Sequence, residues 1–155
     1  MIAVIPYEDK FHPDFKRLNL EWLEKYNICE QYDLDILNDP IGQIIEPGGC
    51  LFIATENDKV VGTAGLAKSH EEGVYELVKM AVDPDMRGKG LGKLLLEKCI
   101  EEAKQRNAKK ISLFSNSQLS TALTMYEKYG FRHIPVTDSY LLTANVKMEL
   151  SLASN

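Results

Sequence analysis

Residues 80–95 read "MAVDPDMRGKGLGKLL", and this stretch decides what the rest of the chain must build. Gly88, Gly90 and Gly92 lack a Cβ atom, so the backbone there can bend freely and let a ligand come close. The residues that follow keep the apolar spacing of a helix: Leu91, Leu94, Leu95, Cys99 and Ala103. The N-terminus of a helix offers unpaired N–H donors and the positive end of a dipole, which suits a phosphate. The stretch therefore predicts a phosphate-binding loop that leads into a helix.

Length and charge narrow the class of protein. A chain of 155 residues is long enough to bury a sizeable core, which predicts one domain over residues 1–155. The net charge of −5 gives no basic surface of the kind that binds nucleic acid or an anionic membrane, so neither partner is expected. The sequence leaves open whether the protein is a monomer or a homodimer.

The three cysteines, Cys29, Cys50 and Cys99, are far apart and form no CxxC pair. This usage is typical of a reducing compartment and argues against a disulfide framework or a zinc site. The sequence has no apolar run long enough to span a membrane, and its N-terminus lacks the pattern of a signal peptide. We therefore expect a cytoplasmic protein that holds no metal.

The chain alternates between strand-like and helix-like segments. Strands are predicted at residues 1–8, 50–56, 60–69, 74–82, 109–115, 131–136 and 145–153. Helices are predicted at residues 11–26, 29–40, 91–107 and 119–130, with a short helix or turn at 41–49. This order predicts an α/β fold in which helices cover both faces of a sheet. The last strand is expected to lie antiparallel beside its neighbour.

Residues 87–93 could form one of three kinds of glycine-containing loop. A Walker loop needs Ser or Thr after its lysine, but Leu94 follows Lys93. A dinucleotide fingerprint needs a third glycine where Lys93 stands, and it does not follow a β-meander. A plain glycine turn remains open, although three glycines and three cations in seven residues make it the weaker alternative.

The pattern that fits is Arg87-x-x-Gly90-x-Gly92, placed directly after a strand that ends in Met80-Ala81-Val82. It resembles the acyl-CoA loop of the GNAT family of N-acetyltransferases. The strands before it, the long helix after it, "KKISLFSNS" and "ALTMYEKYGF" recur in that family in the same order, so the resemblance is strong from Gly49 to Phe131.

The resemblance implies a mixed, mostly antiparallel central sheet and an acetyl-CoA-dependent N-acetyltransferase. In the family, backbone N–H groups of this loop bind the pyrophosphate of coenzyme A. Carried over by position, the expected acetyl-CoA-binding residues are Met80, Ala81, Val82, Arg87, Gly88, Lys89, Gly90, Leu91, Gly92, Lys93, Asn116 and Tyr126. At the end of the strand, around Met80 and Val82, a backbone N–H is expected to reach the thioester carbonyl.

Glu76 is the candidate general base. Strict alternation along 74–82 would place this carboxylate on one face with Val74, Val78, Met80 and Val82. Partial burial there favours a basic carboxylate. It also matches the strand glutamate that is the general base in part of the family. The alternative is a structural glutamate, solvated or paired with Lys79 or Arg87.

Two further side chains have both a structural and a functional interpretation. The helical spacing of Tyr126 is typical of a core aromatic residue, whereas its place in "ALTMYEKYGF" matches the family tyrosine that protonates the departing CoA sulfur. Asn116 matches an asparagine that holds the pantetheine arm, and capping of the following helix is the rival explanation.

The acceptor is expected to be a primary amine of a small molecule or peptide that attacks the thioester directly in a ternary complex. Segments 27–40 and 135–145 would grip it, because in this fold they lie opposite coenzyme A. Glu30, Asp33 and Asp35 could attract a cation there, or could form a solvated helix face. A CoA-binding sensor or regulatory module without turnover is the alternative function.

Overall fold

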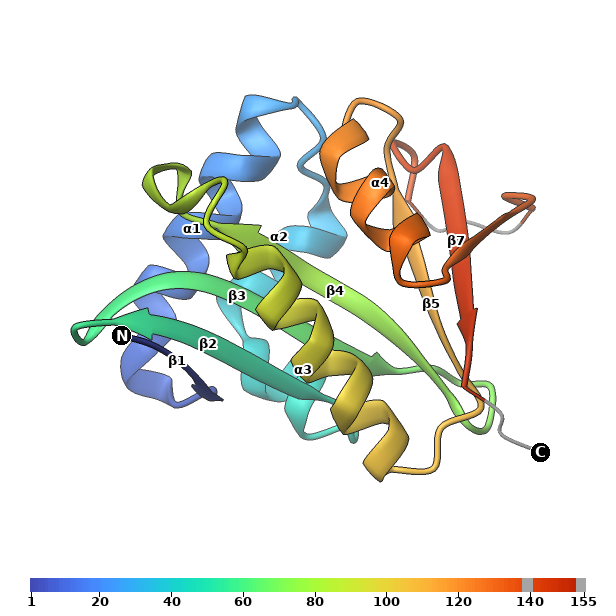
Figure 1. Ribbon diagram of the computed structural model, residues 1–155, viewed down its shortest axis with the longest axis horizontal. Helices are drawn as coiled ribbons and strands as arrows, with labels where there is room; N and C mark the ends of the chain where they lie inside the picture. Colours follow the sequence, from blue (N-terminus) through green and yellow to red (C-terminus); the bar gives the residue numbers. More distant parts are fainter. Residues whose placement is uncertain (138–140, 153–155) are drawn as a thin grey trace.

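The computed structural model describes residues 1–137 and 141–152, and within them seven strands form one sheet (Figure 1). The strands stand in the order β1-β2-β3-β4-β5-β7-β6. Their bounds are β1 Ile2–Pro6, β2 Cys50–Glu56, β3 Lys59–Lys68, β4 Val74–Val82, β5 Lys110–Ser115, β6 Arg132–Ile134 and β7 Val146–Ser151. The last strand lies between β5 and β6 and is antiparallel to both.

Helices cover both faces of this sheet, as the sequence predicted (Figure 1). Their bounds are α1 His12–Lys25, α2 Gln31–Asn38, α3 Leu91–Gln105 and α4 Ser120–Lys128, with a π-helical turn at Ile41–Ile45. One core cluster packs α3 and α4 against the sheet, and a second packs α1 and α2 against the other face. No helix within these described ranges is long and apolar enough to cross a membrane.

The sheet opens between β4 and β5. The four strands β1 to β4 form an antiparallel meander, whereas β4 and β5 run parallel. The parallel register covers only Val74–Glu76 against Lys110–Ser112. Beyond Glu76 the two strands have no pairing in the described residues, so one edge of β4 faces a gap in the sheet. The fold is thus a mixed, mostly antiparallel sheet, and it divides at the parallel pair of β4 and β5.

A bulge in β4 changes which side chains share a face. The register between β3 and β4 shifts between Thr63 and Gly65, and Lys79 has a positive φ of 54°. Before the bulge, Leu77 belongs to the core cluster on the α3 side of the sheet, and Val78 belongs to the cluster on the α1 side. After it, Met80 and Val82 pack on the α3 side. The expectation that Glu76 shares its face with Met80 and Val82 was therefore wrong, because the extra residue reverses the alternation.

The glycine loop leads into α3 as predicted. Gly90 is the N-cap of the helix and has a left-handed backbone with φ of 78°, a conformation that glycine adopts without steric cost. Leu91, Leu95, Cys99 and Ala103 are buried in the core beneath the helix. Leu94 is 43% exposed, so it does not belong to this apolar stripe.

Candidate active site

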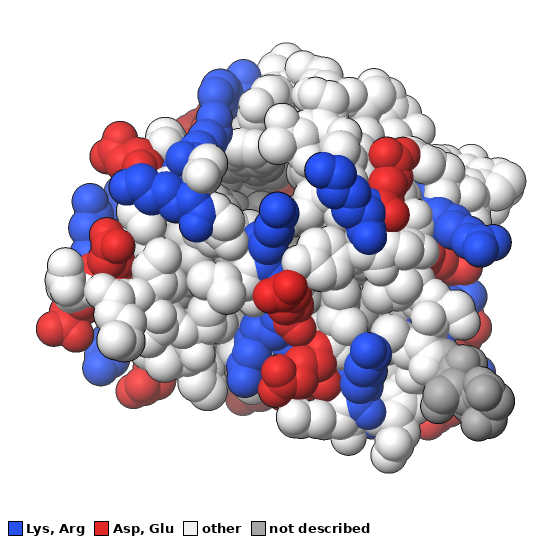
Figure 2. Space-filling model, in the orientation of Figure 1, with Lys and Arg blue, Asp and Glu red and all other residues white. Residues whose placement is uncertain are grey.

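A cleft of about 740 Å³ lies where β4 and β5 part. Its lining comes from β4 beyond Glu76, the glycine loop with the first turn of α3, the end of β5, α4, and the facing sides of α1 and α2. Figure 2 shows a hollow in the upper part of this face, with Lys and Arg side chains around it. Arg87, Lys93 and Lys128 are among the cleft-lining cations.

The structure brings most of the predicted site residues together at this cleft. The lining includes Glu76, Met80, Ala81, Val82, Arg87, Gly88, Gly90, Leu91, Gly92, Lys93, Asn116 and Tyr126. Lys89 is exposed and is not part of the lining. Within residues 1–137 and 141–152, no group of three His, Cys, Asp or Glu residues could hold a metal ion.

Two glycines of the loop have backbone conformations that favour glycine. Gly88 and Gly90 both have positive φ angles, 77° and 78°, and a Cβ atom on either would meet no atom within 4 Å. Backbone conformation, rather than crowding, is therefore what requires glycine at these two positions. The guanidinium of Arg87 lies 5.0 Å from the ring centroid of Trp22, which holds the start of the loop against α1.

Glu76 stands at the point where the sheet divides. It is the last residue of β4 in register with β5, where it faces Ser112, and its side chain is half-buried. The next residue on the same face is the buried Val78, which packs against the α1 core. A carboxylate is thus held at the inner end of the cleft beside apolar surface.

Tyr126 is both a core residue and a wall of the cleft. Only 7% of it is exposed, and its ring lies 5.7 Å from the ring of Phe131. Burial raises the pKa of its hydroxyl above the ordinary value for tyrosine, so the group keeps its proton at neutral pH. The two interpretations of Tyr126 are therefore compatible.

The side chain of Asn116 organises the chain around the end of β5. Its Oδ1 accepts a hydrogen bond from the backbone N–H of Gln118 (2.9 Å), and its Nδ2 donates to the carbonyl oxygen of Thr143 (2.7 Å). The first bond forms a turn just before α4, whose own N-cap, Leu119, has no side-chain cap. Asn116 thus ties α4 to segment 141–145 while it lines the cleft.

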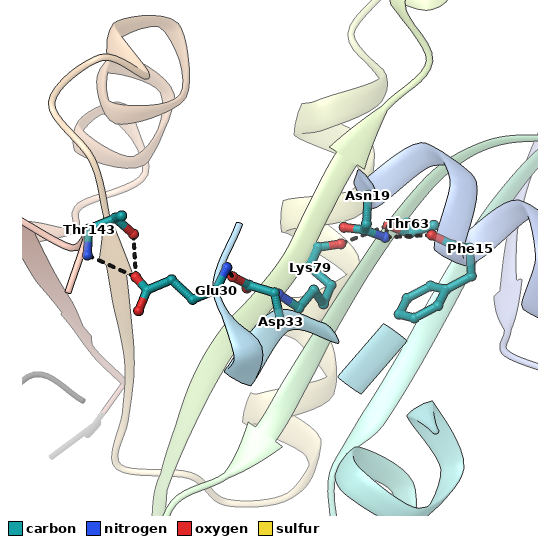
Figure 3. Close-up of polar contacts among 7 residues, drawn as sticks. All are labelled: Phe15, Asn19, Glu30, Asp33, Thr63, Lys79 and Thr143. Carbon is teal, nitrogen blue, oxygen red and sulfur yellow. Dashed lines mark hydrogen bonds and ion pairs between the residues drawn. The ribbon is translucent and has the colours of Figure 1, made fainter. Parts of the chain in front are cut away.

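Sequence reasoning missed the buried ion pair on the α2 side of the cleft. The Nζ of Lys79 binds the Oδ1 of Asp33, and the side chains are only 7% and 9% exposed (Figure 3). The other oxygen of Asp33 accepts from the backbone N–H of Glu30 (2.9 Å). The ring centroid of Tyr32 lies 5.8 Å from the same Nζ. A solvated helix face, one of the two interpretations of these acidic residues, is thus wrong for Asp33.

Glu30 bridges the two segments that were expected to grip the acceptor. Its carboxylate accepts hydrogen bonds from the backbone N–H groups of Leu142 (2.9 Å) and Thr143 (2.8 Å) and from the Thr143 hydroxyl. Burial alone would raise the pKa of Glu30, but these bonds outweigh it and lower the pKa. Segment 135–145 includes residues 138–140, which lie outside the described residues.

The sequence is similar to known proteins. The sequence matches the acetyltransferase (GNAT) family over residues 13–131. It is 36% identical over 107 residues to human N-acetylaspartate synthetase, covering 69% of this chain and 34% of that protein. It is 32% identical over 133 residues to the Bacillus subtilis N-acetyltransferase YvbK, covering 83% and 84%.

The fold has a close match among solved structures. A GNAT-family acetyltransferase from Staphylococcus aureus superposes with a TM-score of 0.88 at 26% identity, over 99% of this chain and 100% of that one. The chain spans about a third of the length of the N-acetylaspartate synthetases, but most of the length of YvbK.

Proposed function

The chain belongs to the acetyltransferase (GNAT) family, whose enzymes use acetyl-CoA, and from this premise we propose that it moves an acetyl group from acetyl-CoA to a primary amine of a small molecule or peptide. The observation that carries the proposal is the cleft at the division of the sheet. It places the α3 N-terminus, a half-buried carboxylate and a buried tyrosine along one continuous surface.

Acetyl-CoA fits the loop end of the cleft. The first backbone N–H groups of α3 have no partner within the helix, and such donors suit the pyrophosphate. The space beside Gly88 and Gly90 is open, so a ligand can come close to the backbone there. Arg87 and Lys93 add positive charge at the same end. The pantetheine arm then runs along the open edge of β4, past Met80 and Val82, and reaches Asn116 and Tyr126.

The reaction is a direct transfer in a ternary complex. Glu76 takes a proton from the acceptor ammonium, directly or through a water molecule, and the neutral nitrogen attacks the thioester carbonyl carbon. A backbone N–H at the end of β4 donates to the oxyanion that forms. The oxyanion then collapses, the C–S bond breaks, and the thiolate takes the proton of Tyr126. The attacking nitrogen loses its remaining extra proton as the amide forms, and this proton returns through water to Tyr126. Glu76 releases its proton to the solvent, so one proton is released in each turnover. The products are the N-acetylated amine and free coenzyme A.

The acceptor end of the cleft favours an amine that is protonated in solution. Two carboxylates, Glu76 and Asp33, line this end of the cleft, and Asp33 is paired with Lys79. The carboxylate of Glu76 lies where a substrate ammonium would approach the thioester. The name of the human relative, N-acetylaspartate synthetase, adds amino acid α-amines to the candidate acceptors.

An acceptor screen with acetyl-CoA tests the proposal. Amino acids, polyamines and short peptides are each incubated with the protein, and the release of free thiol is followed together with the mass of the product. We expect thiol release that depends on the acceptor, with a gain of one acetyl group on its nitrogen. Binding of acetyl-CoA without acceptor-dependent thiol release across the screen would favour the alternative, a CoA-binding module without turnover.

A further inference from the structure

Thr63 contacts the β4 bulge from within the sheet. It lies in β3, its residue is 0% exposed, and its hydroxyl donates a hydrogen bond to the backbone carbonyl oxygen of Lys79 (2.7 Å) (Figure 3). Lys79 is the residue with positive φ at the bulge. A threonine hydroxyl therefore holds one strained peptide group of β4.

Asn19 fixes the direction of this hydroxyl. Its Nδ2 donates to the Oγ1 of Thr63 (3.0 Å) and to the carbonyl oxygen of Phe15 (2.9 Å). Because a carbonyl can only accept, the atom that faces Phe15 must be the amide nitrogen, which identifies the orientation of Asn19. Thr63 thus accepts from Asn19, and its one hydroxyl hydrogen goes to Lys79.

The peptide that Thr63 holds also contains the N–H of Met80. In a trans peptide the C=O of one residue and the N–H of the next point in opposite directions. The carbonyl of Lys79 points to β3, so the N–H of Met80 points to the other edge of β4, which faces the gap beside β5. Downstream, Asp83 N–H donates to Val61 in β3, so strand alternation independently turns Met80 N–H away from β3.

We propose that Thr63, oriented by Asn19, is a positioning residue that aims the Met80 N–H at the thioester carbonyl of acetyl-CoA. This inference rests on the proposed function, which places that carbonyl at the open edge of β4. The buried ion pair between Lys79 and Asp33 anchors the side chain of the same bulge residue, so the peptide is held at both its backbone and its side chain.

Two substitutions of Thr63 distinguish the effect of its hydroxyl group from the effect of its packing in the core. Thr63→Val keeps the shape of the side chain and removes the donor, whereas Thr63→Ser keeps the donor and removes a methyl group. Val60→Ala, a buried change elsewhere in β3, is the control for stability alone. We expect kcat to fall about tenfold to a hundredfold in Thr63→Val, with the KM for acetyl-CoA within about twofold of the parent, because loss of a full oxyanion donor costs 10²–10³-fold. Thr63→Ser and Val60→Ala should stay close to the parent.

A spectroscopic measurement reports directly whether the Met80 N–H donates a hydrogen bond to the thioester carbonyl. A hydrogen bond to the thioester carbonyl lowers its stretching frequency, so bound acetyl-CoA labelled with ¹³C at that carbonyl reports the contact. We expect the shift seen on binding to the parent to shrink in Thr63→Val and to persist in Thr63→Ser and Val60→Ala. If Thr63→Val does not fold, Thr63→Ala, which leaves space instead of an apolar group, carries the same comparison.

The outcomes distinguish this inference from the proposed function. A parent protein without acetyl transfer and without a carbonyl shift would overturn the proposed function and the inference together. The parent could instead be active and lower the stretching frequency of the thioester carbonyl. If Thr63→Val then had the same kcat and the same frequency shift, only the role of Thr63 would be overturned.

Discussion

Neutralising Asp33 is expected to destabilise the whole fold, because it leaves a buried lysine without its counter-charge. The side chains of Lys79 and Asp33 are 7% and 9% exposed, so water cannot replace the lost partner. In Asp33→Asn the amide keeps nearly the same shape and can still accept from the backbone N–H of Glu30. The main loss is therefore the charge that faces the Nζ of Lys79.

The size of the effect follows from this burial. Removing one partner of a buried ion pair costs about 3–5 kcal/mol. For a chain of this length each kcal/mol shifts the melting temperature by about 2–4 °C, so Asp33→Asn should lower Tm by roughly 6–20 °C. Asp14→Asn is the matched control, because the Asp14–Arg17 pair is about half exposed and should contribute less than about 1 kcal/mol.

Thermal and urea denaturation followed by circular dichroism measure these changes. The double variant Asp33→Asn, Lys79→Met removes both charges, and we expect it to regain most of the lost stability, since replacing a whole buried pair is often close to neutral. A fall in Tm for Asp33→Asn no larger than that for Asp14→Asn would refute the reasoning. So would a double variant that is less stable than either single variant.

Three further predictions concern the part of the cleft that would hold acetyl-CoA. Gly90→Val forces a branched side chain into a left-handed backbone, which costs about 1–2 kcal/mol or more, and it places a Cβ in the open space beside the loop. Calorimetry should therefore show loss of CoA binding in Gly90→Val, whereas Lys89→Ala should weaken binding only modestly. Parental affinity in Gly90→Val would mean that the loop does not hold CoA. Tyr126→Phe keeps the ring that packs against Phe131 and removes the proton donor. We expect kcat to fall about 10²-fold while Tm stays nearly unchanged. Unchanged turnover would mean that Tyr126 is a core residue alone. Because burial raises the pKa of Tyr126, an acid in this role should stay protonated above pH 10, and the rate should show no loss from its ionisation below that pH.

The sequence predicted those features that local chemistry determines. Glycines before an apolar helical run predicted the loop and the start of α3, and the order of strands and helices predicted a sheet covered on both faces. These signals lie within a few residues of each other in the chain. Glu76 and Tyr126 were chosen largely from their positions in short motifs, and both line the cleft, while their catalytic roles stay predictions.

The features that were missed depend on residues far apart in the sequence. The bulge at Lys79 inserts one residue into a strand whose alternation looked regular, and only the register with β3 reveals it. Asp33 lies 46 residues before Lys79, within an acidic helix that resembled a solvated surface. Thr63 and Asn19 are 44 residues apart. No periodicity within either segment predicts these contacts, because the folded sheet creates them.

The pH dependence of the rate in Glu76→Gln tests the central claim most directly. The amide keeps the shape of the side chain and removes its basicity, so CoA affinity should remain while kcat falls by about 10²- to 10⁴-fold near neutral pH. As the pH rises, free amine forms without a base, and the variant should recover part of the parental rate. A variant with the parental rate and an unchanged pH profile would contradict the account, because the acceptor proton would then leave by a route that does not involve Glu76.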